Sequence, residues 1–138
     1  MDYYDLDRFI KAHKKDYDIA LKEIQNGKKQ SHWMWYIFPQ LRDLGHSTTA
    51  KYYGIKNKEE ALAYLKNELL KKHLIEISEA VLKINNDIKN IFGYPDYLKL
   101  KSCMTLFYIV DPSINVFNNV IEKFYNGELD INTISLLK

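Results

Sequence analysis

The chain has 138 residues, 46% hydrophobic and 28% charged, which is typical of one folded domain with a single core. A net charge of +2 is too small to indicate a strongly cationic nucleic-acid or membrane-binding surface, and the single cysteine, Cys103, excludes an internal disulfide. No apolar run is long enough to span a bilayer, and Asp2, Asp5 and Asp7 interrupt the opening segment where a signal peptide would be apolar. We therefore expect a single α-helical domain, residues 1–138, in the cytoplasm and without a membrane partner.

The first helix is predicted from apolar residues at every third or fourth position between Leu6 and Ile24, and Gly27 is expected to end it. The segment that follows, residues 27–47, holds both tryptophans. Its bulky residues between positions 33 and 38 point to all sides of a helix, which indicates an element covered by its neighbours. Ser31 is a candidate N-cap, and Pro39 cannot continue a helix. The pattern predicts a central tryptophan-rich helix from Ser31 to Phe38.

The rest of the chain also reads as helices joined by short loops, because no run alternates with period two over a strand length. The segment from Asp96 to Val110 is almost continuously apolar after Ser102 and is expected to be a second buried helix. Other helices are predicted to begin near Ser47 or Thr48, Asn57, Glu68, Asp87, Ser113 and Asp130. The fold class expected is all-α, a compact single-domain array of about seven to nine helices around the tryptophan-rich helix.

Four segments carry a resemblance to a known family: HWMWYIFPQL, LGHS, GYPDYLKLKSCMTLF and GELDINTISLL. Together they resemble a bacterial family of domains of unknown function, numbered 1810, over essentially the whole length. Members are sometimes mislabelled calpastatin, but calpastatin is a disordered inhibitor and this chain has a globular composition. The resemblance implies a compact multi-helical domain and implies no activity.

A candidate anion site lies at the start of the tryptophan-rich helix. The N–H groups after Ser31 and the positive end of the helix dipole would attract a phosphate or carboxylate, with Lys28, Lys29 and His32 as cationic donors beside them. The alternative is that Ser31 only caps the helix and the lysines are solvated surface, since Gly-Lys-Lys alone is no phosphate-loop signature.

A candidate pocket combines His32 of the tryptophan-rich helix and Gln40, His46 and Ser47 of the turn after it with Lys99, Ser102 and Thr105 of the second buried helix. Apolar walls with a few convergent polar groups are the usual composition of a small-molecule site. His32 would act as general acid or base, and Trp35 would stack on an aromatic ligand such as a nucleobase. The alternative is a buried hydrogen-bond network that fixes helix packing, as expected above all for Thr105.

Other chemistry is weakly indicated. Cys103 lies among apolar neighbours inside a helix, where thiols are usually inert. There is no HExxH motif, no paired cysteine and no histidine pair at helical spacing, so we expect no metal and no cofactor. His13 and His73 fall on apolar stripes and are expected in the core or at its edge. Nucleic-acid binding ranks third, because no recognition motif accompanies the small net charge.

The leading hypothesis is a domain that binds a small anionic ligand of nucleotide or phospho-metabolite type. His32 would be the catalytic acid or base if the domain is an enzyme, and the ligand-binding residues would be Lys29, Ser31, Trp35, Gln40, His46, Ser47, Lys99 and Ser102. The rival hypothesis is a helical protein–protein interaction module without catalytic activity. The sequence leaves open the substrate, the oligomeric state, and whether the protein is an enzyme.

Overall fold

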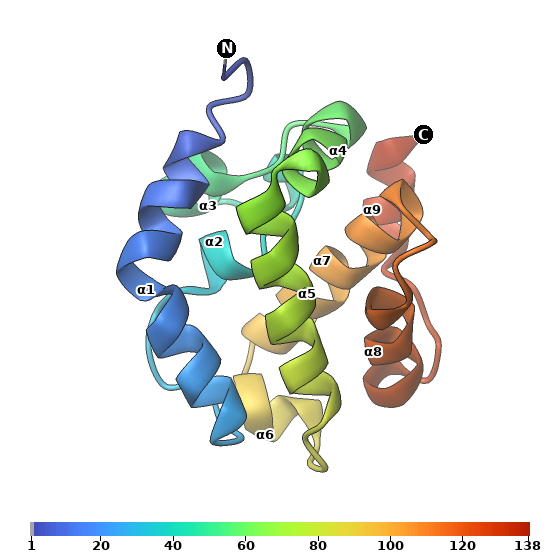
Figure 1. Ribbon diagram of the computed structural model, residues 1–138. Helices are drawn as coiled ribbons and strands as arrows, with labels where there is room; N and C mark the ends of the chain where they lie inside the picture. Colours follow the sequence, from blue (N-terminus) through green and yellow to red (C-terminus); the bar gives the residue numbers. More distant parts are fainter. Residues whose placement is uncertain (1) are drawn as a thin grey trace.

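The computed structural model describes residues 2–138, and the architecture is all-α (Figure 1), as predicted. Within these residues nine α-helices and one 3₁₀ helix occur and no strand is formed, although an isolated parallel bridge joins Leu41 to Ile55. The helices are α1 (Asp7–Gln25), α2 (Met34–Ile37), η1 (Arg42–Leu44, the 3₁₀ helix), α3 (Thr48–Tyr53), α4 (Lys58–Lys66), α5 (Glu68–Leu82), α6 (Ile88–Phe92), α7 (Asp96–Val110), α8 (Asn115–Tyr125) and α9 (Ile131–Leu137).

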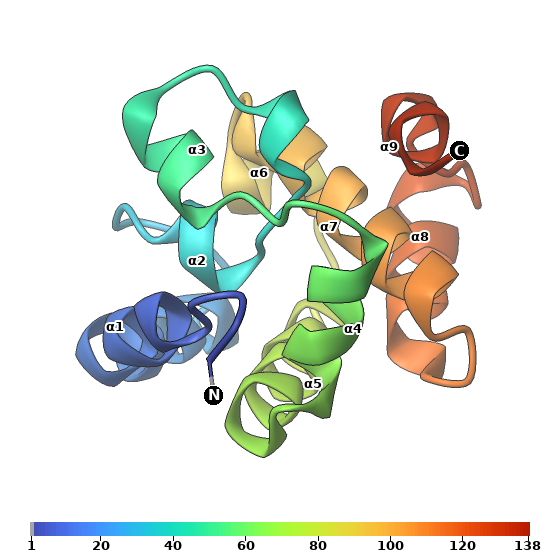
Figure 2. The ribbon, with the colours of Figure 1, turned by 90° about the horizontal axis from the view of Figure 1, so that it is seen from above.

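The long helix α5 lies between α1 and α8 and packs against both (Figures 1 and 2). α7 packs against α8, α9, α4 and α6, and its residues from Ser102 to Phe107 are all buried. This burial confirms the expectation of a second buried segment. The buried apolar side chains form one continuous cluster, which includes residues from every α-helix except the short α3 and α9.

The tryptophan segment differs from its prediction. A helix from Ser31 to Phe38 is wrong in its bounds, because α2 is a single turn, Met34–Ile37, and Ser31 does not cap it. The backbone N–H groups of Gln30 and Ser31 bond the side chain of Glu23 on α1, so the chain approaches α2 in a loop instead of a helical turn. Trp33 and Phe38 are nevertheless fully buried on either side of that turn. A tryptophan-rich helix at the centre is not confirmed.

Most predicted helix starts are correct because a side chain caps the first turn. Ser47 accepts from the N–H of Ala50, Asn57 from that of Glu60, and Asp130 from that of Thr133. Asp96 is an exception, since it begins α7 without a capping hydrogen bond from its side chain and pairs with lysines instead. In the described part of the chain, no helix has the length and apolar character needed to cross a membrane.

Candidate functional site

Lys29, the predicted anion clamp, lies in the loop after α1 and is held by protein groups. Its Nζ is 3.0 Å from Asp96 Oδ2 and donates to the carbonyl oxygen of Ser31 at 2.6 Å. It also lies 5.1 Å from the centroid of the Trp33 ring, a cation–π distance. The Lys29 side chain is only 8% exposed. A carboxylate of α7 thus already stands opposite this lysine.

The donors around Ser31 converge on Glu23, which the sequence analysis did not single out. Glu23 Oε1 accepts from the backbone N–H of Gln30 at 2.7 Å, from that of Ser31 at 2.8 Å and from Trp33 Nε1 at 2.9 Å. Ser31 Oγ donates to Glu23 Oε2 at 2.5 Å. Burial raises the pKa of Glu23, but these donors outweigh it and lower the pKa to about 2. The chain's own carboxylate therefore occupies the predicted anion position.

Three predicted ligand-binding residues do come together, in a small hollow beside α2. Trp35, Gln40 and Lys99 line it, together with Met34, Phe38, Ala50 and Gly54. Lys99 Nζ lies 5.8 Å from the centroid of the Trp35 ring and 3.6 Å from Asp96 Oδ1. The hollow has a volume of about 10 Å³, which is room for no more than about one water molecule.

The other predicted site residues lie outside that hollow. The side chains of His32 and His46 are exposed, each in a loop. Ser47 Oγ caps α3, 3.0 Å from the N–H of Ala50. Ser102 Oγ bonds within its own helix to the carbonyl oxygen of Leu98 and lies 3.2 Å from the carboxylate of Asp130. The structure thus separates these four residues from the three that meet in the hollow.

A larger cationic hollow of about 550 Å³ lies between the loop after α1 and α6. The N–H of Lys29 donates to the carbonyl oxygen of Ile91 at 2.8 Å and ties the loop to α6. Lys28 and Lys89 are exposed at its edges. Its lining contains three lysines, two asparagines and no aspartate or glutamate: Gly27, Lys28, Lys29, Asn86, Lys89, Asn90, Ile91, Phe92 and Gly93. We name this site the lysine hollow.

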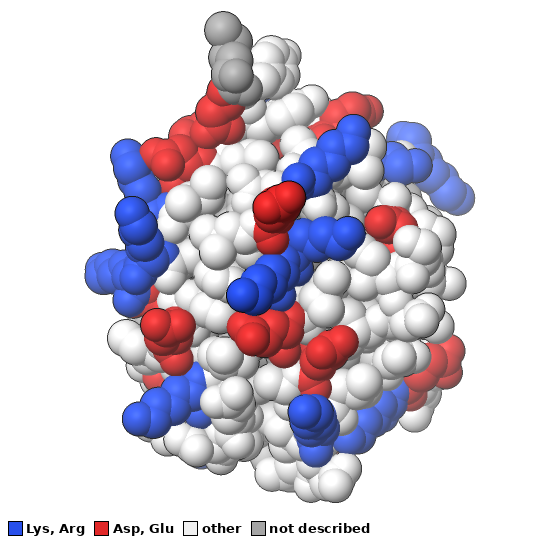
Figure 3. All heavy atoms as spheres, in the orientation of Figure 1, with Lys and Arg blue, Asp and Glu red and all other residues white. Residues whose placement is uncertain are grey.

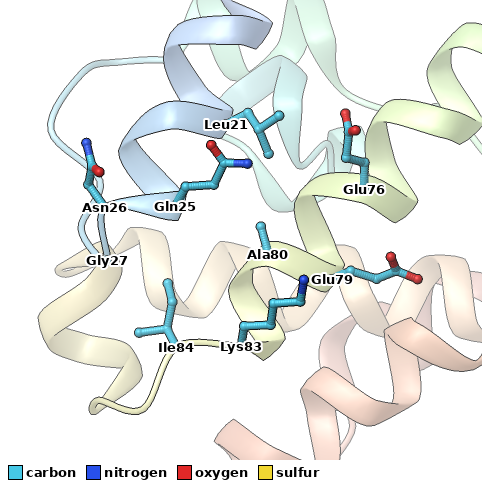
Figure 4. A pocket seen from close by; sticks show the side chains of 9 residues that line it. All are labelled: Leu21, Gln25, Asn26, Gly27, Glu76, Glu79, Ala80, Lys83 and Ile84. Atoms are coloured by element: carbon cyan, nitrogen blue, oxygen red, sulfur yellow. The ribbon is translucent and has the colours of Figure 1, made fainter.

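A groove of about 590 Å³ separates the carboxyl-terminal half of α1 from that of α5 (Figure 4). Gln25 and Asn26 line it on one side, and Glu76 and Glu79 of α5, with Lys83 just after that helix, line it on the other. Its charges are of both signs, and lysines and carboxylates are likewise interspersed over the face of the molecule drawn in Figure 3. This groove contains none of the predicted site residues, and its charge favours no one class of ligand.

Two histidines predicted for the core or its edge lie side by side. His13 on α1 is 3% exposed and His73 on α5 is half-buried, as expected, and their Nδ1 atoms are 2.9 Å apart. The sequence could not reveal this pair, because its members come from different helices, 60 positions apart. No group of three or more histidine, cysteine or acidic side chains in residues 2–138 is arranged to hold a metal ion.

Comparison with known proteins identifies the family. The crystal structure of the conserved hypothetical protein Rv1873 from Mycobacterium tuberculosis is similar to this chain, with a TM-score of 0.95 and 43% sequence identity over 97% of this chain and 96% of that one. No curated protein matches. The sequence profile described as "Protein of unknown function (DUF1810)" matches residues 3–137, which confirms the resemblance seen in the sequence. The chain therefore belongs to the DUF1810 family.

Proposed function

We propose that the protein binds a small anionic ligand of nucleotide or phospho-metabolite type in the lysine hollow. One observation carries this proposal: three lysines and no carboxylate line a hollow of about 550 Å³, a size typical of small-molecule sites. Lys28 and Lys89 are exposed, and neither forms an ion pair with any group in residues 2–138. The Lys89 Nζ lies 5.5 Å from the centroid of the Tyr97 ring, a cation–π distance that leaves its N–H groups able to donate to phosphate oxygens, as those of Lys28 can.

The asparagines of the hollow supply neutral donors. Asn90 Nδ2 donates to Asn86 Oδ1 at 3.2 Å, and the same Oδ1 accepts from the N–H of Asp87 at 2.7 Å. These two bonds fix the Asn86 amide with its Nδ2 group unused by them, as a donor for an anion. Lys29 remains paired with Asp96, so its charge is largely balanced and it shapes the hollow more than it contacts the ligand.

The remaining predicted residues have distinct places in the proposal. The hollow lined by Trp35, Gln40 and Lys99 is too small to hold a nucleobase. A nucleobase would therefore stack on the outer face of the Trp35 ring, beside Lys99 and Gln40. His32 is exposed three positions after Lys29 and is the proposed acid or base if a reaction takes place. The hydroxyls of Ser31, Ser47 and Ser102 already bond protein groups, so these residues would shape the site from its surroundings. His46 has no observed contact that supports a role.

The test is binding of pyrophosphate, AMP and ATP, measured by calorimetry and amide NMR shifts. Lys28→Gln/Lys89→Gln should weaken binding at least about tenfold, since loss of about 1.4 kcal/mol in charge-assisted contacts has that effect. The matched control is Lys58→Gln/Lys66→Gln on α4, which removes the same charge from exposed lysines and should bind like the wild type. Equal losses in both variants, or no saturable binding to the wild type, would refute the proposal.

A second candidate is the helical interaction module, for which exposed apolar side chains are the supporting observation. Tyr94, in the turn before α7, is 80% exposed, and Leu98, in the first turn of α7, is 43% exposed. Exposed apolar side chains of this kind can contact a protein partner. If the lysine hollow binds none of the anions, a defined complex that is lost in Tyr94→Ser/Leu98→Ser would favour this function.

A further inference from the structure

The histidine pair lies where α1, α2 and α5 meet. His13 and His73 rings are nearly parallel, and the ring of Tyr17, which is 3% exposed, stacks on His73 with 3.6 Å between centroids. Tyr17 OH donates to the carbonyl oxygen of His73 at 3.1 Å and to Glu76 Oε1 at 2.6 Å. His13 Nε2 lies 2.8 Å from the carbonyl oxygen of Tyr36. These polar contacts join α1 to both of its neighbours.

The hydrogen-bond partners fix where each ring carries its proton. The carbonyl oxygen of Tyr36 can only accept, so His13 must be protonated at Nε2. A neutral His13 then has a lone pair at Nδ1, and the proton between the two Nδ1 atoms belongs to His73. His73 Nε2, which has no hydrogen-bond partner in the described residues, is the one basic nitrogen left in the pair.

The pair has room for one extra proton but not for two. A proton added at His73 Nε2 leaves the Nδ1–H···Nδ1 bond and the His13 bond to Tyr36 intact. A second proton, at His13 Nδ1, would set two N–H groups against each other across 2.9 Å and place two positive charges side by side. Burial, the largest cause, and the charge on His73 act in this direction and lower the pKa of His13 to about 4, although the hydrogen bond to the carbonyl oxygen of Tyr36 raises it.

The charged groups around the pair discriminate between the two rings. Burial lowers the pKa of His73, and the carboxylates of Glu76 on α5 and Asp18 on α1 partly offset this by favouring its positive charge, while Lys72 opposes it. On the α2 side, the phenol of Tyr36 bonds Asp16, so that carboxylate is engaged away from the rings. The Tyr17 phenol is engaged by Glu76, and burial raises its pKa. The first proton is therefore directed to His73.

We infer that His13 and His73 form a one-proton site that holds α1 against α5 while the pair carries no extra proton or one, and that a second proton separates the rings. The pair is in this way an acid-sensitive contact built into the α1–α5 interface. It is independent of the ligand proposed for the lysine hollow.

Ring ¹⁵N NMR of the whole protein between pH 8 and pH 4 tests the inference. At pH 8, His13 should be protonated at Nε2 and His73 at Nδ1, two opposite neutral tautomers. On acidification His73 should gain a proton while the native amide spectrum persists and His13 stays neutral, with exposed His32 and His46 as internal references. Identical tautomers in the pair, or two charged rings within an unchanged native spectrum, would overturn it.

A variant supplies an independent measurement. In His73→Gln the amide can still donate to His13 Nδ1 but cannot ionise. Its melting temperature should fall less than that of the wild type between pH 7 and pH 4, whereas the control His32→Gln should keep the wild-type dependence. A wild-type dependence in His73→Gln would overturn the inference, and if that variant fails to fold, the tautomers of the wild type decide.

Discussion

The indole N–H of Trp33 donates to Glu23 Oε1 across 2.9 Å, so a fully buried ring is oriented by a carboxylate at the end of α1. The same carboxylate collects donors from Gln30 and Ser31. Gly27, at a φ of +90°, turns the chain back toward α1 and makes this convergence possible. One side chain therefore holds the whole passage from α1 to α2.

Glu23→Gln should destabilise the protein at pH 7 by about 2 kcal/mol, because an amide accepts fewer of these hydrogen bonds and solvent screens part of the effect at a half-buried site. The folded-state pKa of Glu23 is lowered to about 2 from 4.5. The stability it contributes is thus present above about pH 4.5 and is lost as the pH falls toward 2. Urea unfolding at pH 7, 4 and 3 should show that the difference in unfolding free energy between the wild type and the variant shrinks as the pH falls. Glu79→Gln, an exposed control, should show no such convergence, and a gap for Glu23→Gln that stays constant with pH would contradict the prediction.

Arg8→Met should cost about 3–5 kcal/mol, the range for leaving one member of a buried ion pair alone. Arg8 Nη2 lies 2.6 Å from Glu60 Oε2, and both side chains are buried. The guanidinium also donates to the carbonyl oxygens of Tyr4, Asp5, Tyr52 and Gly54. Denaturant unfolding of Arg8→Met, Glu60→Leu and the double variant would give the coupling energy. The double variant should be more stable than the sum of the single losses implies, and strict additivity would count against the pair.

Gly54→Ala should destabilise the protein by about 1–3 kcal/mol through steric overlap. A Cβ at this position would lie 2.4 Å from the Cα of Arg42, although the backbone φ of −65° suits any residue. Gly27→Ala is the matched comparison, since there a Cβ meets nothing within 4 Å and only the positive φ is unfavourable. Melting curves would separate the two causes: Ser at position 54 should be as harmful as Ala, whereas Asn at position 27 should be milder than Ala. A wild-type melting temperature for Gly54→Ala would contradict the packing described.

Tyr64→Phe should leave stability unchanged or raise it by about 1–3 kcal/mol. The Tyr64 hydroxyl is fully buried and has no hydrogen-bond partner among residues 2–138, which penalises the folded state. Tyr17→Phe is the control, because that hydroxyl makes two hydrogen bonds and its loss should destabilise. Urea unfolding of both variants decides, and a destabilised Tyr64→Phe would show that the hydroxyl has a partner in solution.

The helices could be predicted from the sequence because their signals are local. Apolar spacing, the caps at Ser47, Asn57 and Asp130, and the glycine stop at Gly27 each act within one or two turns. The bounds of α2 could not be predicted, since they depend on Glu23, a residue of the preceding helix that takes up the donors of the approaching loop. The bulky apolar residues around Trp33 correctly indicated burial, but they overestimated the length of the helix.

The candidate site was only partly visible in the sequence for the same reason. Lys28 and Lys29 mark one edge of the lysine hollow, but Asn86 and Lys89 reach it from α6 and its preceding turn, about 60 positions away, by packing that no local pattern encodes. Trp35, Gln40 and Lys99 do meet, as expected for the candidate pocket, yet apolar neighbours fill the space between them. The sequence shows which chemical groups are available, but it does not show how much empty volume the fold leaves between them.

The bridge between Leu41 and Ile55 implies a boundary within the fold. The N–H of Arg42 bonds the carbonyl oxygen of Ile55 at 2.8 Å, and the N–H of Ile55 bonds that of Gln40 at 2.9 Å, so η1 and α3 form an excursion whose two ends meet. A segment whose two ends are hydrogen-bonded to each other can unfold locally while the helices on either side stay folded. In a hydrogen-exchange experiment, the amides between these two ends should exchange together as one unit. The amides of Arg42 and Ile55, which make the two closing hydrogen bonds, should exchange last.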